Sequence, residues 1–311
     1  MKEMSKGQIW AAQFRAPFLL LAVVLVLMGW SLAMKYPAPG GFCWIDAILL
    51  MIGVVSAHIS VNLFNEYSDY KTKIDFETKQ TPFSGGTKMM IEGRTTPKSV
   101  KIASYITLSL GLLIGFYFTF TAHWFLIVII AIGAFATVYY TTLLAKILLG
   151  EFSAGLALGY LVVVGTYIAM TASPGMAVNE LVPLEVWLIS IPAGILTSLL
   201  LLLNEFPDVE ADTKGGRYHL LIKFGWKKSA VIYIFGMIAT FGTVIILPIL
   251  GISSYWIYLA LLPLPVAAKA CQTALRHGDD REKLIPALGQ NVLVVLGTDF
   301  LLAVGVFIDA L

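Results

Sequence analysis

Two short segments of the chain, LFNEYSDY and LLNEFPDV, carry amide and carboxylate side chains at spacings suited to binding a cation. Residues four apart lie on one face of an α-helix, so Asn65 stacks with Asp69 and Asn204 stacks with Asp208. The second face continues to Asp212, four residues further along. Two segments that are alike in pattern and far apart in sequence predict a diverged internal repeat whose polar ends face each other.

Facing carboxylates repel each other, so a cation must offset their charge. Mg²⁺ prefers oxygen ligands and typically takes one or two carboxylates from the protein, while phosphate oxygens of a substrate fill other positions. The paired segments therefore predict two Mg²⁺ ions with a diphosphate bridging them. Basic residues near both segments suit the same anion and would stabilise a departing diphosphate. They are Lys71, Lys73, Lys79, Lys88, Lys146, Lys214 and Arg217.

Capping of helix ends is the simpler explanation for any one such segment taken alone. Capping predicts neither the repetition nor a third acid in each segment, which is Asp75 in the first and Asp212 in the second. Asp75 lies ten residues after Asn65 and would leave its helical face, so we expect the helix to break before it. Pro207 removes a backbone hydrogen bond and predicts a bend in the second helix.

The elements that position these segments are predicted to cross a membrane. Of the 311 residues, 58% are hydrophobic and 13% are charged, and the mean hydropathy is +0.84, which excludes a water-soluble globule of this size. A helix needs about 20 apolar residues to cross a hydrocarbon core of roughly 30 Å. The sequence predicts an all-α, polytopic bundle of nine transmembrane helices. They lie near residues 16–35, 44–64, 100–121, 123–142, 152–172, 184–203, 229–249, 252–270 and 288–309.

Basic residues give the predicted orientation, because Lys and Arg concentrate on the cytoplasmic side of a membrane. A cytoplasmic N-terminus places every one of the 21 Lys and Arg except Lys35 on that side, and it leaves the C-terminus outside. The chain is then a single membrane domain, residues 1–311, in a prokaryotic-type cell membrane. Its two longest cytoplasmic loops, residues 66–99 and 205–228, follow spans two and six and contain the acidic residues.

These residues resemble the UbiA superfamily of membrane prenyltransferases, whose members have nine helices and an aspartate-rich motif after helix two and helix six. NLFNEYSDYKTKID and NEFPDVEADTKGGRYHLLIKFG are similar to the two motifs of the branch that prenylates 1,4-dihydroxy-2-naphthoate, and TPFSGGTKMMIEG resembles its Ser-Gly-Gly segment. The chain departs from the usual pattern at three places. Glu66 replaces a more usual Asp, His219 stands where Thr is common, and no proline precedes Lys146.

The resemblance implies Mg²⁺-dependent transfer of a polyprenyl group from a polyprenyl diphosphate to an aromatic acceptor. The favoured acceptor is 1,4-dihydroxy-2-naphthoate of menaquinone biosynthesis, and the alternatives are 4-hydroxybenzoate, another quinone precursor or a glycerol phosphate lipid. No nucleic-acid partner is implied. The implied metal ligands are Asn65, Asp69, Asp208 and Asp212, and the implied catalytic residues are Asp69, Asp75, Asp208 and Asp212. The implied diphosphate ligands are Lys73, Lys146, Lys214 and Arg217, and the implied substrate contacts are Asn62, Asn65, Tyr140 and Asn204.

The chemistry implied by residues and resemblance together forms an allylic cation, which must be kept from water in an apolar chamber with aromatic faces. An electron-rich ring then attacks the cation, and Asp75 is the candidate that orients the acceptor or takes the ring proton. The aromatic candidates for the chamber are Phe64, Tyr67, Tyr139, Tyr140, Tyr160 and Phe206.

Two other classes of membrane protein use acidic residues and remain as alternatives. A phosphotransferase acting on nucleotide-linked alcohols concentrates its acids in one motif, whereas this chain has two distant ones. A secondary transporter is expected to place acids near the membrane midplane. Here the acids lie at the predicted cytoplasmic surface beside Lys and Arg, which favours a polyanionic head group over a transported ion.

Overall fold

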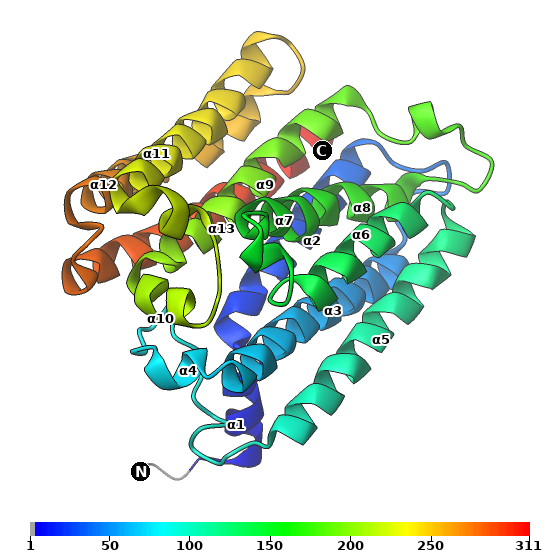
Figure 1. Ribbon diagram of the computed structural model, residues 1–311. Helices are drawn as coiled ribbons and strands as arrows, with labels where there is room; N and C mark the ends of the chain where they lie inside the picture. Colours follow the sequence, from blue (N-terminus) through cyan, green and yellow to red (C-terminus); the bar gives the residue numbers. More distant parts are fainter. Residues whose placement is uncertain (1–3) are drawn as a thin grey trace.

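The computed structural model describes residues 4–311, and this part of the chain is helical without any strand (Figure 1). Lys2, one of the basic residues that orient the chain, lies outside the described residues. The helices of the first half are α1 Lys6–Gln13, α2 Leu20–Lys35, α3 Trp44–Lys71, α4 Ile74–Glu77, α5 Pro97–Thr121, α6 Leu126–Tyr139 and α7 Gly150–Ala154. Those of the second half are α8 Leu161–Thr171, α9 Leu184–Asn204, α10 Val209–Lys214, α11 Leu220–Ile249, α12 Leu264–His277 and α13 Arg281–Ala310.

Short 3₁₀ turns and one π-helical segment connect these helices. The π-helical segment, Gly155–Tyr160, joins α7 to α8, so the three together form the predicted fifth span. It packs closely on α9, because a Cβ at Gly155 or Gly159 would collide with the backbone of that helix. The 3₁₀ turns lie at Ala16–Leu19, Leu144–Lys146, Val178–Glu180, Phe206–Asp208 and Tyr255–Leu261.

Within residues 4–311, eight helical segments are long and apolar enough to cross a membrane. They match eight of the nine predicted spans. The remaining one, predicted at 123–142, is the apolar helix α6, which has only 14 residues. At 1.5 Å per residue, α6 covers roughly 21 Å, less than a typical hydrocarbon core. The all-α membrane architecture is confirmed, while the count of nine spans stays a prediction.

Both aspartate segments interrupt their helices where the sequence predicts a break. Helix α3 ends at Lys71, Lys73 takes a left-handed backbone conformation with φ of 63°, and α4 then begins with Asp75 in its first turn. Helix α9 ends at Asn204, and Pro207 lies in a 3₁₀ turn before α10. Asp69 stays within α3, whereas Asp75, Asp208 and Asp212 lie in the short segments that follow the breaks.

The two interrupted segments meet at one end of the bundle. Figure 1 shows α4 and α10 side by side, and Ile74 of α4 lies so close to Gly215 that a Cβ there would collide with it. Helix α1 lies at this end of the molecule, whereas the C-terminus lies at the other (Figure 1). The first part of the predicted repeat geometry, two acidic segments in contact, is therefore present.

An ion-pair cluster joins three helix ends at the opposite end of the bundle. The ammonium of Lys35, at the end of α2, lies 2.6 Å from a carboxylate oxygen of Glu185 and 2.6 Å from one of Asp309. Glu185 is buried at the start of α9, and Asp309 belongs to the last turn of α13. Lys35, the single basic residue that the predicted topology leaves outside, therefore ties α2, α9 and α13 together.

Lys35→Met should lower the free energy of unfolding by about 3 kcal/mol, because it strands the buried carboxylate of Glu185 without a cation. Thermal unfolding in detergent would register this as a lower midpoint. The double variant Lys35→Met/Glu185→Gln should recover part of the loss, since it also removes the unpaired charge. A double variant no more stable than the single one would contradict this account.

Candidate active site

One guanidinium connects the two acidic segments. Arg217 donates to Asp69 at 2.5 Å and to Asp212 at 2.8 Å, with all three side chains largely withdrawn from solvent. Burial alone would lower the pKa of Arg217, but the carboxylates of Asp69 and Asp212 outweigh burial and hold it well above its usual value. Carboxylates from α3 and α10 thus share a single positive charge.

The other two predicted acids flank this centre. Asp208 accepts a hydrogen bond from the Ser84 hydroxyl at 3.4 Å. Asp75 is buried under the next residues of the same loop, since a Cβ at Gly86 would collide with its carboxylate. Burial, followed by the neighbouring carboxylates of Glu66 and Asp69, raises the pKa of Asp75 to about 7. The Ser-Gly-Gly segment therefore lies over the aspartates.

A cavity of about 340 Å³ begins one helical turn before the aspartates, on the side toward the interior of the bundle. Asn62, Asn65, Tyr140 and Asn204 all line its polar end, and Asn65 and Asn204 each lie one helical turn before an aspartate. Asn65 accepts a hydrogen bond from Thr141 at 2.7 Å. The buried side-chain oxygen of Asn204 has no hydrogen-bond partner among the described residues. That oxygen is available to a ligand.

The rest of the lining is mainly apolar, with Arg15 and His58 among its polar residues, and the cavity extends from these asparagines to the far end of α5. Its walls come from α3, α5, α6, α8, α9 and the π-helical segment, and Phe118 and Leu126 lie at its apolar end. The polar and apolar ends together fit an amphiphile with a small charged head and a hydrocarbon tail.

The aromatic lining differs from the sequence prediction. Of the six candidates, Tyr140 alone lines the cavity within residues 4–311, together with Phe18 and Phe118, which the sequence did not single out. Phe64 packs edge-on against Tyr105, and the ring of Tyr67 lies 5.6 Å from the ammonium of Lys101. Successive residues of an α-helix point about 100° apart around its axis. Phe64 and Tyr67 therefore point away from the face that carries Asn65 and Asp69, and toward α5.

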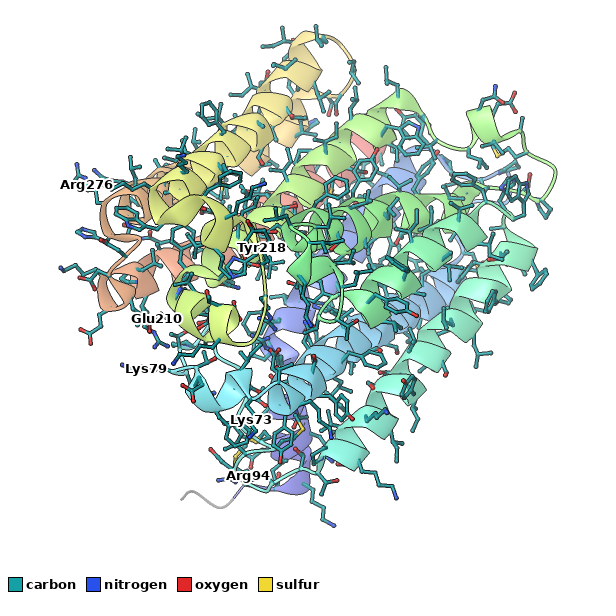
Figure 2. All side chains as sticks on the ribbon, in the orientation of Figure 1. Lys73, Lys79, Arg94, Glu210, Tyr218 and Arg276 are labelled. Atoms are coloured by element: carbon teal, nitrogen blue, oxygen red, sulfur yellow. The ribbon has the colours of Figure 1, made fainter. Side chains whose placement is uncertain are left out.

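Three of the four predicted diphosphate ligands lie outside this centre. Lys73 and Lys146 are exposed, and Lys214 forms an exposed ion pair with Glu77 at 3.1 Å. Figure 2 shows Lys73 and Lys79 near α4, on the side of the molecule where α10 lies. Of the four predicted ligands, Arg217 is the one whose side chain pairs with aspartate carboxylates, while Lys88 donates to the backbone carbonyl of Asp75.

Glu66, which the sequence pattern pairs with Asn65, neighbours Asp75 but is held by hydrogen bonds to α1 and to the loop after α4. It is 3% exposed and accepts hydrogen bonds from Gln13 at 3.2 Å and from the Thr87 hydroxyl at 2.7 Å. Gln13 in turn accepts from Thr95 at 2.6 Å. Glu66 therefore fastens α1 and the loop after α4 to α3, a role that no local sequence signal reveals.

Comparison with known proteins identifies the family. The UbiA prenyltransferase family matches residues 22–288, which include both aspartate segments. The chain belongs to the UbiA prenyltransferase family. It is therefore an enzyme of the prenyltransferase class, as the sequence motifs predicted.

Relatives of this family member share one name. The chain is 27% identical to the 1,4-dihydroxy-2-naphthoate octaprenyltransferase of Bacillus subtilis, over 98% of this chain and 94% of that protein. It is 24% identical to the protein of the same name from Escherichia coli, over 99% of this chain and 98% of that one. It is also 24% identical to its namesake from Mycobacterium tuberculosis, over 81% and 82% of the two chains.

Solved UbiA structures share the fold. The apo structure of a UbiA homologue from Aeropyrum pernix K1 superposes with a TM-score of 0.69 at 15% identity, covering 95% of this chain and 98% of that one. A UbiA homologue from Archaeoglobus fulgidus bound to GPP and Mg²⁺ superposes with a TM-score of 0.53 at 13% identity, covering 94% and 99%. At these identities the likeness is one of fold.

Proposed function

We propose that this protein transfers a polyprenyl group from a polyprenyl diphosphate to 1,4-dihydroxy-2-naphthoate, with Mg²⁺ as cofactor, in menaquinone biosynthesis. The observation that carries the proposal is the convergence of Asp69 and Asp212 on one cation at the mouth of an apolar cavity. The names of the relatives support the acceptor, and the ligands of the Archaeoglobus fulgidus homologue support the donor and the metal.

The donor set fits magnesium. Carboxylates from both segments lie within reach of one guanidinium, and the amide oxygens of Asn65 and Asn204 lie one turn below. Oxygen ligands of this kind suit Mg²⁺, and we assign Asn65, Asp69, Asp208 and Asp212 to it. When bound, Mg²⁺ supplies positive charge that stabilises the departing diphosphate.

The residues of the chain account for the remaining needs of the reaction. Arg217 occupies the position between the two segments and would turn toward diphosphate oxygens once a substrate arrives. Asn62 and Tyr140 contact the reacting end of the donor, and Lys73, Lys146 and Lys214 supply a basic rim. The apolar cavity walls hold the prenyl tail and keep water from the allylic cation.

The proposed arrangement in the membrane follows the basic residues. We infer that the aspartate end faces the cytoplasm, that the C-terminus lies outside, and that the whole chain functions as one domain with nine spans. The loops 66–99 and 205–228 then present the site to a water-soluble acceptor, while the prenyl tail enters from lipid.

The deciding experiment supplies purified protein with Mg²⁺, a labelled polyprenyl diphosphate and a panel of acceptors. The panel contains 1,4-dihydroxy-2-naphthoate, 4-hydroxybenzoate and glycerol phosphate lipids, and the products are identified by mass. We expect a prenylated dihydroxynaphthoate and stoichiometric diphosphate. If the enzyme prenylates only another compound of the panel, that compound is the acceptor in place of 1,4-dihydroxy-2-naphthoate. If the polyprenyl diphosphate remains intact and no product forms, the proposed function is wrong.

Gly133→Phe should shorten the donor that the enzyme accepts. Gly133 lines the cavity, and no atom lies within 4 Å of the position where its Cβ would be built. A phenyl ring would occupy space meant for the prenyl tail. We expect kcat/KM for a long polyprenyl donor to fall at least about tenfold, roughly 1.4 kcal/mol, with little change for geranyl diphosphate.

Gly242→Phe is the matched control for this prediction. Gly242 also has open space at its Cβ position, but it lies in α11 and does not line the cavity. Its substitution should leave the preference for donor length unchanged. Equal losses for long and short donors in Gly133→Phe would show that the tail does not occupy this cavity.

Asp75→Asn should remove the acid limb of the pH profile. As proton acceptor, Asp75 works only when ionised, so activity should rise as the pH rises through its pKa. That pKa is about 7 in the free protein, and bound cations would move it lower. We expect a loss of about 10²-fold in kcat, with a rate that no longer depends on pH between 5 and 8. An unchanged profile would assign proton removal to another group.

A further inference from the structure

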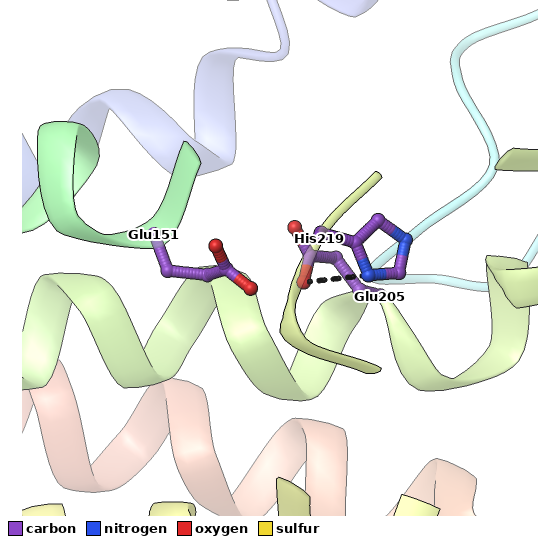
Figure 3. Close-up of side chains that lie close together, drawn as sticks. All are labelled: Glu151, Glu205 and His219. Carbon is purple, nitrogen blue, oxygen red and sulfur yellow. Dashed lines mark ion pairs between the residues drawn. The ribbon is translucent and has the colours of Figure 1, made fainter. Parts of the chain in front are cut away.

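A second cluster of ligand-type side chains lies behind the aspartates, outside the proposed diphosphate site. Glu151 of α7, Glu205 at the end of α9 and His219 just before α11 place one ligand atom each within 4.8 Å of one another. Figure 3 shows the carboxylates of Glu151 and Glu205 and the imidazole of His219 directed toward the same point. All three residues are less than 8% exposed.

The cluster contains polar atoms without partners, which is unusual for buried groups. One oxygen of Glu151 accepts from the backbone N–H of Leu220 at 2.8 Å, but its second oxygen has no hydrogen-bond partner among the described residues. The same holds within residues 4–311 for Oε2 of Glu205 and for both ring nitrogens of His219. Oε2 of Glu205 and Nδ1 of His219 face each other, whereas Nε2 of His219 faces Asp212.

Charge balance also favours a cation. When ionised, the two buried carboxylates carry a charge of −2, while Arg217, two residues before His219, is already engaged by Asp69 and Asp212. A divalent ion would neutralise the cluster. Burying two ionised carboxylates without a cation is strongly unfavourable.

We propose that Glu151, Glu205 and His219 bind a structural divalent transition-metal ion of the Zn²⁺ class, separate from the Mg²⁺ ions of the reaction. The distance from His219 Nδ1 to Glu205 Oε2 is 3.5 Å. Two ligands of a tetrahedral zinc ion with bonds of about 2.0–2.2 Å lie roughly 3.4 Å apart. An imidazole ligand favours Zn²⁺, Fe²⁺ or Mn²⁺ over Mg²⁺.

The opposite edge of the imidazole supports the assignment. His219 Nε2 lies 3.3 Å from an oxygen of Asp212. A histidine that binds a metal through one ring nitrogen commonly pairs its other nitrogen with a carboxylate in this way. The ion would connect α7, α9 and α11 behind the second aspartate segment. Backbone hydrogen bonds already join the segments that precede α7 and α11, since Tyr218 donates to Ala145 at 2.8 Å and accepts from Leu148 at 3.1 Å. The metal would therefore hold Asp212 in place without touching substrate.

Zinc binding can be measured without prenyl transfer. Purified protein, freed of purification tags and stripped with chelator, is titrated with Zn²⁺ in competition with a zinc indicator, without Mg²⁺ or diphosphate. We expect one tightly bound Zn²⁺ per chain. Glu151→Gln, Glu205→Gln and His219→Thr should each weaken binding at least about tenfold. Asp208→Asn and the exposed Glu210→Gln are the matched controls and should retain the ion.

The outcomes separate the possibilities. Absence of stoichiometric zinc in the wild-type protein would overturn the proposal and leave a carboxylate pair that shares a proton. Loss of zinc in Asp208→Asn but not in Glu151→Gln would overturn it by placing the ion at the aspartates. If a variant fails to fold, zinc-edge X-ray absorption of the wild-type protein decides: one imidazole among oxygen ligands supports the site, and a shell of oxygens alone refutes it.

Discussion

Asp69→Asn or Asp208→Asn should each lower the rate of prenyl transfer by about 10³-fold or more, roughly 4 kcal/mol of transition-state stabilisation. Asn is nearly isosteric with Asp, so the fold should survive while one negative charge is lost. The two residues come from opposite segments, and in the proposed assignment each contributes to the charge that retains divalent ions over the cavity. The measurement is diphosphate release from a polyprenyl diphosphate at saturating acceptor.

The size of this loss follows from the position of the two residues. Neither charge is replaced by a neighbour, because Asp212 already belongs to the same proposed set of metal ligands and Glu66 is bonded to Gln13 and Thr87. Both variants should also need more Mg²⁺ for half-maximal activity. Glu210→Gln is the matched control, since it removes an exposed carboxylate from α10 and should cost less than about twofold. Activity within threefold of wild type in either aspartate variant would contradict the metal assignment.

The meeting of the two acidic segments was predictable from sequence because it rests on local rules. A spacing of four residues places Asn65 and Asp69 on one face, and the same spacing repeats after α9. The helix break before Asp75 and the turn at Pro207 also follow from local chemistry, and both are present. Composition alone predicted the membrane bundle, because apolar runs of about 20 residues have the length that a helix needs to cross a bilayer.

Pairing between distant residues was not predictable in the same way. Periodicity says which face a side chain takes but not which turn of another helix meets it. Nothing near Glu66 indicates that Gln13, 53 residues earlier, will bind it. Arg217 was one basic residue among seven candidates, and only the packing of α10 against α4 distinguishes it from the exposed Lys73.

The fourth span shows a limit of apolar composition. The run at 123–142 is mostly apolar, but the structure makes only Leu126–Tyr139 helical within it. Phe125 precedes the helix in a turn that His123 stabilises, since its ring accepts from the Phe125 backbone at 3.2 Å. After Tyr139, turns lead to Lys146, which places Tyr140 and Thr141 at the cavity mouth. Hydropathy cannot distinguish such functional turns from helix.

Arg217→Gln should weaken binding of prenyl diphosphate while strengthening binding of Mg²⁺ in its absence. In the free protein the guanidinium of Arg217 holds Asp69 and Asp212 together and competes with any cation for them. Removing it frees both carboxylates, so Mg²⁺ should bind about tenfold more tightly, roughly 1.4 kcal/mol. The diphosphate loses a charge-assisted partner, and its KM should rise at least about tenfold.

Thermal unfolding in detergent, with and without Mg²⁺, tests the competition directly. Without Mg²⁺, Arg217→Gln should unfold at a lower temperature than wild type, because two largely buried carboxylates then repel each other with no shared cation. Adding Mg²⁺ should raise its midpoint by about 2–4 °C more than it raises that of wild type. Arg217→Lys keeps the charge without the bidentate fork, so its response should fall between the two. A smaller Mg²⁺ response in Arg217→Gln than in wild type would mean that Arg217 helps to retain the metal, and the competition inferred from its two ion pairs would be wrong.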